Sequence, residues 1–242
     1  MRVILLADVH ANWEALLSLQ RAEAKPDALL FAGDAVGYGP NPAHCVRWLL
    51  SNATAAVRGN HDEAACHVGT NVPPTGAPPE LEEAGRETVN YARAVLAASE
   101  VLGLQQWPLF TCTELGGARF YLTHGSPLDP LGGQMHPATC PEAELHRMFD
   151  GVPGDVIVLG HTHMPAIRQF NGRLIVNPGS LGQPRYGVPD ATYAVWQDGA
   201  VQIKHLHYDH EATANKLRMA PLSAEAAGQL TSILETGMVE SI

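Results

Sequence analysis

The chain has 242 residues, of which 45% are hydrophobic, and a formal net charge of −10. Enough apolar surface is present for a sizeable core, which excludes a disordered or linker-like protein. The negative charge opposes binding along a nucleic-acid backbone, whereas small phosphate substrates are compatible with it. No apolar run approaches the roughly 20 residues that cross a bilayer, and the first strand is expected directly after Met1, so we predict a cytoplasmic protein without a membrane partner.

Short apolar runs alternate with helical periodicity at the start of the chain. Asn12 is a plausible N-cap for the first helix, and Pro42 stands near the first turn of the second. Alternation of this kind predicts an α/β fold with buried parallel strands. In chain order, the expected elements are a strand at residues 2–7, a helix at 13–24, a strand at 28–32, a helix at 43–51 and a strand at 54–57.

The middle of the chain has a different composition. Residues 72–79 are rich in proline, and residues 80–102 carry apolar side chains at helical spacing, which predicts a loop followed by one long helix. Residues 80–102 contain no candidate metal ligand. We therefore interpret residues 66–110 as a helical insertion over the core, which serves either as a lid that selects substrates or only as packing.

The strand pattern resumes at residue 118. Asn171-Gly172 is a strong two-residue hairpin signal, and a second hairpin is expected around Asp198-Gly199. The expected strands lie within residues 118–125, 155–163, 166–180, 192–197 and 200–208. Residues 209–242 are predicted to form a C-terminal helical extension that ends after Gly237, and the whole chain to form a single domain.

Side chains that can bind metals follow each of five predicted strands. The ends of parallel strands meet in one crevice, so these loops are expected to converge there. Carboxylate and imidazole groups together favour ions such as Mn²⁺, Fe or Zn²⁺. Seven ligands are too many for one ion, and they divide naturally between two ions about 3.5–4 Å apart with a bridging carboxylate. The seven are Asp8, His10, Asp34, Asn60, His124, His161 and His163.

The motifs D-x-H, G-D, G-N-H-D, T-H-G and G-H-T-H, in this order, resemble the calcineurin-like metallophosphoesterase superfamily over residues 1 to about 205. The segments DVHAN, GDAVGYGPNP, RGNHD, GHTHMP and NPGSLGQPR most resemble its small prokaryotic phosphodiesterases, a group with a non-catalytic relative in the retromer subunit Vps29. The resemblance implies a four-layer α/β/β/α sandwich of two mixed sheets with flanking helices, to which the helical insertion is added.

The resemblance also implies how the ligands are shared. Asp8, His10 and His163 would hold one ion. Asn60, His124 and His161 would hold the other, and Asp34 would bridge the two. The implied cofactors are two divalent transition-metal ions, with Mn²⁺ the first expectation and Fe, Zn²⁺, Ni²⁺ or Co²⁺ as alternatives. A scaffold that had lost catalysis would be expected to lack at least one ligand, and this sequence lacks none.

The chemistry that follows is hydrolysis of a phosphate ester. A water between two cations has a lowered pKa and would attack phosphorus as hydroxide. His61 is the candidate general acid for the leaving group, and Asp62 would hold and polarise its imidazole. The alternatives are a structural role for His61 and a helix N-cap role for Asp62.

Three further residues are candidates for substrate contact. Arg185 lies on a glycine-rich loop where a guanidinium would grip phosphate oxygens, although an ordinary surface position explains it equally well. Tyr38 would pack on a base or sugar, or else stabilise its own turn. Arg58, directly before the G-N-H-D motif, completes the group.

The function expected from these residues is that of a binuclear-metal phosphoesterase, a phosphodiesterase first of all, that acts on a small phosphate ester or nucleotide. The first alternative is a nucleotide polyphosphate or phosphoprotein phosphatase. The second is a non-catalytic, retromer-like scaffold. No polymeric nucleic acid is expected as a partner, and a homodimer is a reasonable expectation for a small enzyme of this kind.

Overall fold

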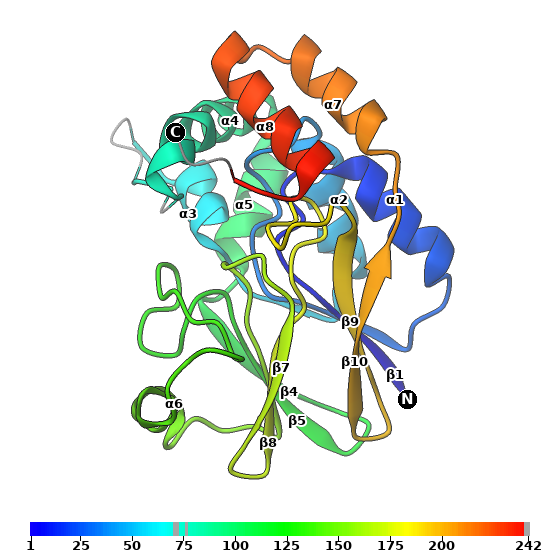
Figure 1. Ribbon diagram of the computed structural model, residues 1–242, viewed down its shortest axis with the longest axis vertical. Coiled ribbons are helices and arrows are strands. Elements are labelled where there is room, and N and C mark those ends of the chain that lie inside the picture. Colours follow the sequence, from blue (N-terminus) through cyan, green and yellow to red (C-terminus); the bar gives the residue numbers. More distant parts are fainter. Residues whose placement is uncertain (70–72, 76, 240–242) are drawn as a thin grey trace.

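Two five-stranded sheets face one another in the computed structural model of the chain, which describes residues 1–69, 73–75 and 77–239 (Figure 1). The first sheet has the strand order β10-β9-β1-β2-β3, in which β1, β2 and β3 are parallel and β9 and β10 are antiparallel. Its strands are β1 (Arg2–Leu6), β2 (Ala28–Phe31), β3 (Ala55–Ala56), β9 (Ala191–Gln197) and β10 (Ala200–Leu206).

The second sheet is also mixed, but its three parallel strands have an antiparallel strand on each side. Its order is β4-β5-β6-β8-β7, and β5, β6 and β8 are the parallel members. In each sheet the parallel strands therefore end at one common edge. The strands are β4 (Phe110–Leu115), β5 (Ala118–Thr123), β6 (Val156–Val158), β7 (Ala166–Phe170) and β8 (Arg173–Asn177).

Alternation along β1 shows how the layers form. Val3 and Leu5 point into the core between the sheets, whereas Ile4 and Leu6 point outward. The outward face of this sheet is covered by α1 (Trp13–Ala22) and α2 (Pro42–Asn52). The outer face of the second sheet is covered by α6 (Glu142–Phe149). The predicted α/β/β/α sandwich of two mixed sheets is thus confirmed.

The predicted single helix over residues 80–102 is wrong. The segment contains a short 3-10 turn (Pro79–Leu81), then α4 (Glu82–Val95) and α5 (Ala98–Gln106), and it follows α3 (Asn60–Cys66). The chain is extended at Leu96 and Ala97, with ψ angles of 134° and 155°. The Glu100 side chain accepts the N–H of Ala97 at 2.7 Å and starts a new helix there.

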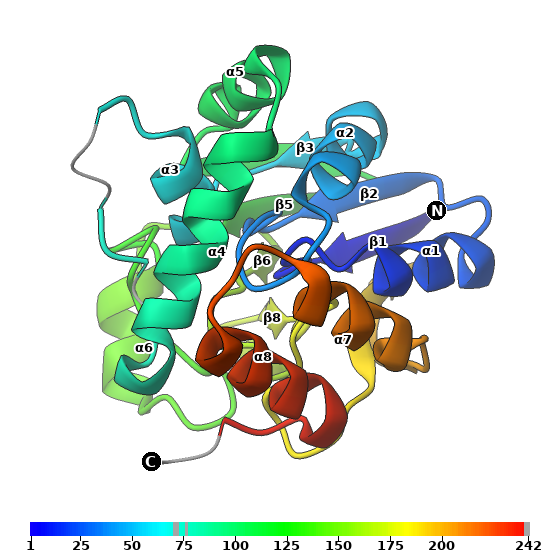
Figure 2. The ribbon, with the colours of Figure 1, turned by 90° about the horizontal axis from the view of Figure 1, so that it is seen from above.

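The C-terminal extension is helical, as predicted. It consists of α7 (His210–Met219) and α8 (Ala224–Thr236), and Gly237 ends α8 in the left-handed conformation. Figure 2 shows α4, α7 and α8 side by side above the ends of the strands, and apolar side chains join them in one cluster. Residues 70–72, 76 and 240–242 of the predicted insertion and extension lie outside the described residues.

Two elements were not predicted from the sequence. β4 alternates exposed and half-buried residues and pairs with β5 through Gly116-Gly117, so the second sheet begins at the end of the expected insertion. α6 follows Pro141 and buries Leu145, Met148 and Phe149. Among all described residues, no helix is both long and apolar enough to cross a membrane.

Candidate metal centre

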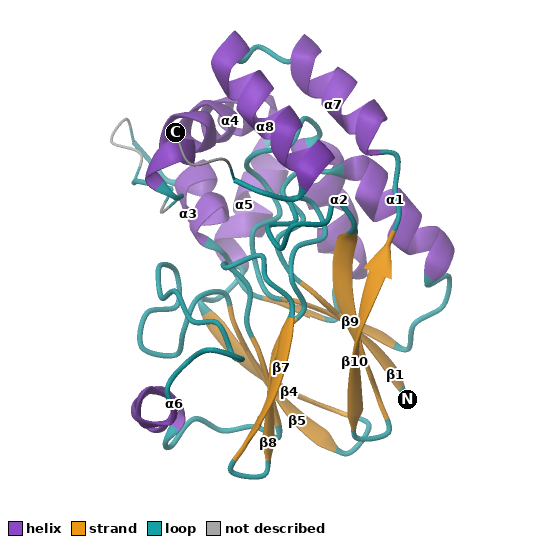
Figure 3. Ribbon diagram, in the orientation of Figure 1, coloured by secondary structure: helices purple, strands orange, loops and turns teal. Residues whose placement is uncertain are grey.

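Loops fill the space between the strand ends and the helices above them (Figure 3). Asp8 and His10 follow β1, Asp34 follows β2, and Asn60 begins α3 just after β3. The second sheet contributes His124 after β5 and the pair His161 and His163 after β6. All seven predicted ligands are at most 8% exposed. The predicted convergence of the five loops is therefore what the structure shows.

Five of the seven candidate ligands have a backbone conformation that non-glycine residues rarely adopt. Their φ angles range from +44° to +70°. Each such residue costs on the order of 1–3 kcal/mol unless the surroundings enforce it, and clusters of them are typical of functional sites. The five are Asp8, His10, Asp34, His161 and His163.

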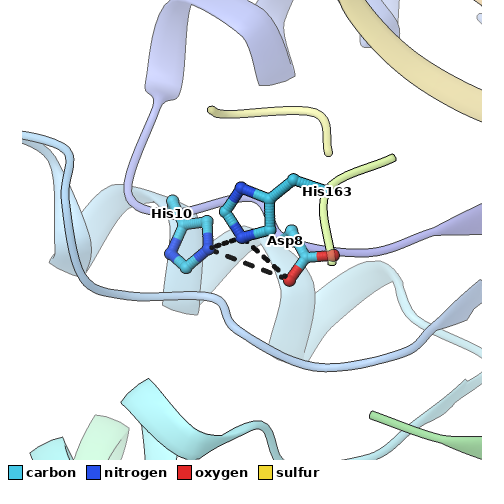
Figure 4. A group of neighbouring side chains, drawn as sticks. All are labelled: Asp8, His10 and His163. Atoms are coloured by element: carbon cyan, nitrogen blue, oxygen red, sulfur yellow. Dashed lines mark hydrogen bonds and ion pairs between the residues drawn. The ribbon is translucent and has the colours of Figure 1, made fainter. Parts of the chain in front are cut away.

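The first group consists of Asp8, His10 and His163 (Figure 4). The Nδ1 atoms of the two imidazoles donate to the carbonyl oxygens of Val36 (2.9 Å) and Gln183 (2.6 Å). A carbonyl only accepts, so each neutral ring directs the lone pair of Nε2 into the site. The two Nε2 atoms are 2.9 Å apart, and an Asp8 oxygen lies 3.8 Å from His10 and 3.5 Å from His163.

Facing lone pairs repel one another unless a proton or a cation lies between them. Burial lowers the pKa of both His10 and His163 well below the usual range, so protonation of these rings is disfavoured. A bound cation satisfies both lone pairs and the nearby Asp8 carboxylate. This arrangement fits the donor set of a transition-metal site.

The second group brings Asn60, His124 and His161 together beside Asp34. The Asn60 Oδ1 atom lies 2.7 Å from His124 Nε2 and 3.0 Å from His161 Nδ1. The amide nitrogen of Asn60 donates to the Thr75 carbonyl, which directs Oδ1 into the site. Asp34 Oδ2 lies 3.3 Å from His124 Nε2 and 3.7 Å from His10 Nε2, so this carboxylate stands between the two groups.

The charges in this group favour a cation. Burial alone would lower the pKa of His124, but the carboxylates of Asp34 and Asp8 outweigh it and raise the pKa to about 9. Burial would raise the pKa of Asp34, yet His124 and His61 outweigh that effect and hold it well below its usual range. The Nδ1 atom of His124 donates to the Ala32 carbonyl at 2.8 Å, so the extra proton sits on Nε2. A metal ion would take the place of this proton.

His61 is buried against the metal centre. Its ring centroid lies 4.5 Å from that of Tyr38 and 5.0 Å from that of His10. It also packs on Gly37, where any Cβ would collide with the imidazole. Its Nδ1 atom has no hydrogen-bond partner among the described residues. Burial lowers the pKa of His61 to about 4, although the Asp34 carboxylate opposes this shift.

The structure places Asp62 differently from the prediction. Its carboxylate accepts the backbone N–H groups of Asp34 (2.9 Å), Ala35 (2.9 Å), Val36 (3.2 Å) and Gly59 (3.2 Å), and within the described part of the chain it forms no hydrogen bond with His61. Asp62 is also not the N-cap, because Gly59 occupies that position and Asp62 is the third residue of α3. A carboxylate that accepts several buried N–H groups fixes a loop firmly, and here the loop is the one that carries Asp34.

The three predicted substrate contacts fall in two places. Arg185 is half-buried, binds the Gln183 side chain at 2.6 Å and lies 5.3 Å from the Tyr38 ring centroid, so both Arg185 and Tyr38 adjoin the metal centre. Arg58 lies elsewhere. It is 2.7 Å from Glu63 and donates to the Gln105 carbonyl at 2.9 Å, which joins α3 to α5 and accounts for this arginine without a substrate.

A cleft of about 630 Å³ opens beside the second ligand group. His161 and Arg185 line it. The other lining residues lie between β5 and α6, in the loop after β6 at Thr162 and Met164, within the predicted insertion at Pro78, and in the C-terminal extension at Met238 and Val239. A second hollow, lined by residues 23–29 and Trp48 where β2 begins, contains no candidate ligand, so the cleft beside His161 is the space relevant to the metal centre.

Several supporting residues were missed by sequence reasoning. The Asn177 side chain donates to the Gly160 carbonyl at 2.7 Å, and the Ser180 hydroxyl donates to the Asp8 carbonyl at 2.7 Å. Both lie in the NPGSLGQPR segment, which begins at the last residue of β8, as does Gln183, whose carbonyl accepts from His163. That segment was recognised as a motif but given only one candidate residue. Its position after a parallel strand was the available signal.

A family model described as the calcineurin-like phosphoesterase superfamily domain matches residues 1–197. The chain is 26% identical over 245 residues to uncharacterized protein MJ0912 of Methanocaldococcus jannaschii. The aligned region covers 89% of this chain and 91% of the relative. Its structure is similar to that of a metallophosphoesterase from Sphaerobacter thermophilus, with a TM-score of 0.81, 26% identity and coverage of 98% and 99% of the two chains. A hypothetical protein, PH1004 of Pyrococcus horikoshii OT3, shares the fold with a TM-score of 0.80 at 19% identity, over 95% and 97% of the chains.

Proposed function

This chain belongs to the calcineurin-like phosphoesterase superfamily, and from that premise we propose that it is a phosphodiesterase that uses two divalent metal ions to hydrolyse a small phosphate ester. The observation that carries the proposal is the pair of imidazole Nε2 atoms of His10 and His163, 2.9 Å apart, with Asp34 between them and the second ligand group. Two such ions would activate a water and stabilise charge on the phosphate oxygens.

The residues of the chain then have distinct tasks. Asp8, His10 and His163 would hold one ion, Asn60, His124 and His161 would hold the other, and Asp34 would be shared between them. We propose Mn²⁺ as the natural ion, because the donor set of imidazole, carboxylate and amide oxygen suits it. Asp62 keeps Asp34 in place through the backbone N–H groups that it accepts.

Two residues act on the substrate itself. Arg185 lies beside the metal centre, and its guanidinium donates hydrogen bonds to a phosphate oxygen. His61 protonates the leaving oxygen, after the negative charge of the bound phosphate has raised the pKa of its imidazole. Tyr38 packs against both side chains and fixes their separation.

Two features support a small substrate. The cleft of about 630 Å³ is lined in part by residues of the insertion and of the C-terminal extension, and the net charge of −10 repels a polyanionic chain. A nucleotide-sized ester fits these limits. No polymeric nucleic acid or membrane is proposed as a partner.

The experiment that tests the proposal measures hydrolysis of bis-p-nitrophenyl phosphate and p-nitrophenyl phosphate by chelator-treated protein, with Mn²⁺, Ni²⁺, Zn²⁺ or Mg²⁺ restored singly. We expect metal-dependent turnover with the diester preferred, abolished by Asp34→Asn. His61→Ala should lower kcat by about 10²–10⁴-fold, the usual contribution of general acid catalysis. Folded protein that binds metal but hydrolyses neither ester would contradict the proposal. A preference for the monoester would favour the phosphatase alternative.

A further inference from the structure

The cleft beside the metal centre has an unusual wall. Three of the six methionines of the chain line it, and they come from three separate segments. Met135 lies between β5 and α6, Met164 follows the metal-centre loop after β6, and Met238 follows α8. Met164 is 40% exposed and Met238 is 54% exposed, so apolar surface here is available to a ligand. Covering such surface favours binding, and a thioether makes good contacts with aromatic rings.

The lining of the cleft combines a cationic side chain with apolar ones. Arg185 lies next to the metal centre, and none of the lining residues that the structure describes is acidic, although the chain carries a net charge of −10. The Gln183 side chain accepts two hydrogen bonds from the guanidinium, at 3.0 and 2.6 Å, and holds it at this junction. The lining thus offers a guanidinium to an anionic group and thioether side chains to an apolar group.

The C-terminal extension is anchored where it meets this cleft. The N–H of Gly187 donates to the carbonyl of Gly237 at 2.8 Å, which ties the end of α8 to the loop that carries Arg185. Gly237 has a φ of +68°, and a Cβ at this position would collide with the Val188 backbone. Met238 is therefore held close to Arg185 by the fold itself.

We propose that this cleft is the binding site for an aromatic ester group, such as the base of a nucleotide, with Met164 and Met238 as its apolar walls. The inference rests on the proposed function, because the phosphate must bind at the metal centre for the ring to reach the cleft. The volume of about 630 Å³ suits a ligand of nucleotide size. The substrate class is accordingly an aryl or nucleoside phosphate ester, and an aliphatic ester would leave the methionines uncovered.

The test compares two non-hydrolysable anions, phenylphosphonate and methylphosphonate, by isothermal titration calorimetry on Mn²⁺-loaded protein. Both carry the same anionic group, and only one carries a ring. We expect phenylphosphonate to bind about tenfold more tightly, because the ring buries apolar surface. In the double variant Met164→Ser, Met238→Ser this ratio should fall below about threefold.

Two control variants separate this effect from general damage. Met164→Leu keeps an apolar side chain of similar size and should retain the ratio. Met219→Ser changes a methionine that is 88% exposed at the end of α7, outside the cleft, and should also retain it. A ratio near one in the unaltered protein, or an unchanged ratio in the double variant, would overturn the inference.

The same measurements distinguish the two proposals. Hydrolysis with equal phosphonate affinities would leave the proposed function standing and remove the aromatic subsite. Selective binding of phenylphosphonate without hydrolysis of any ester would keep the subsite and remove the proposed function. Metal-loaded protein that binds neither phosphonate would overturn the subsite, whatever the outcome of the hydrolysis assay.

Discussion

The metal centre and the adjacent cleft are built in opposite ways. The seven candidate ligands lie on short loops directly after parallel strands, and backbone groups such as the carbonyls of Val36 and Gln183 fix their orientation. The cleft instead takes its walls from segments far apart in the chain, including Pro78 and Met238. The common part of the fold carries the candidate ligands, whereas the insertion and the C-terminal extension contribute part of the lining of the cleft.

A hydrogen bond links the metal centre to the predicted insertion. The amide of Asn60, a candidate ligand, donates to the carbonyl of Thr75, and the Thr75 hydroxyl donates to Glu82 at 3.1 Å. The segment before α4 therefore does more than cover the core, because it also orients a ligand. Whether residues 66–110 act as a lid that selects substrates or only as packing stays a prediction.

The sharpest comparison uses two residues only one position apart, His163 in the metal centre and Met164 in the cleft. His163→Ala should reduce bound Mn²⁺ from two equivalents to about one and lower kcat by more than about 100-fold, beyond the loss seen when only a supporting contact is removed. Met164→Ser should keep both equivalents and alter only the affinity for the ester group. Metal analysis and steady-state kinetics on the two variants measure this.

His67→Ala is the matched control, because His67 ends α3 outside all candidate ligand groups that the described residues form. It should leave the metal content at the level of the unaltered protein. Full metal occupancy in His163→Ala would contradict the assignment of the first ligand group. Loss of metal in Met164→Ser would show that cleft and centre are not separable.

The next largest effect is expected for Asp62→Asn. The carboxylate accepts four buried backbone N–H groups, and an amide replaces one acceptor oxygen with a donor that faces such groups. Leaving buried N–H groups unpaired should cost about 1–3 kcal/mol of unfolding free energy. Metal affinity should fall about 10–100-fold, because the loop with Asp34 loses its support.

Urea unfolding and metal titration check this prediction against Asp150→Asn, a change at a side chain that is 64% exposed. If Asp62 acted instead by polarising His61, the variant would lose kcat with unchanged stability and metal affinity. That result would restore the role predicted from the sequence.

How far the sequence predicts the structure differs between the same two regions. The convergence of Asp8, His10 and Asp34 was predictable because short motifs after parallel strands meet at one edge of a sheet. The partner of Asp62 could not be found in this way. Its neighbour in sequence is His61, but its neighbours in space are backbone N–H groups of the loop after β2.

The elements that were predicted wrongly or not at all have similar causes. The helical periodicity of residues 80–102 continues through Leu96 and Ala97, and only the bond from the Ala97 N–H to Glu100 shows that a second helix starts there. β4 is an edge strand with alternating exposure, so no continuous apolar run marked it. The cleft depends on the packing of α8 near Arg185, which no local pattern encodes.

A smaller effect should appear in the pH dependence of the metal-free protein. The pKa of His124 is about 9 in the folded state and 6.5 in a free side chain, so the folded state binds more protons between these values. Stability must then fall as pH rises through this window, by about 2 kcal/mol between pH 7 and 9. Burial also raises the pKa of Asp8, which acts in the same direction.

Saturating Mn²⁺ should remove most of this dependence, because metal ligands are deprotonated in the complex at every pH of the window. Thermal unfolding at pH 7, 8 and 9, with chelator and with metal, measures both curves. Equal pH dependence in the two conditions would show that neither His124 nor Asp8 exchanges its proton for a metal ion.

The smallest expected effect comes from Ser223→Ala at the start of α8. The Ser223 hydroxyl accepts the N–H of Ala226 at 3.1 Å and donates to Glu87 of α4 at 2.7 Å, so it both caps the helix and joins the two additions. Loss of the cap should cost about 1 kcal/mol. Because α8 leads into Met238, the preference for phenylphosphonate should fall less than twofold while Mn²⁺ affinity stays the same.

Ser51→Ala, at an exposed hydroxyl near the end of α2, is the control and should change neither quantity. A fall in Mn²⁺ affinity with Ser223→Ala would mean that the C-terminal extension supports the metal centre as well as the cleft. The two regions would then depend on the same segment of the chain.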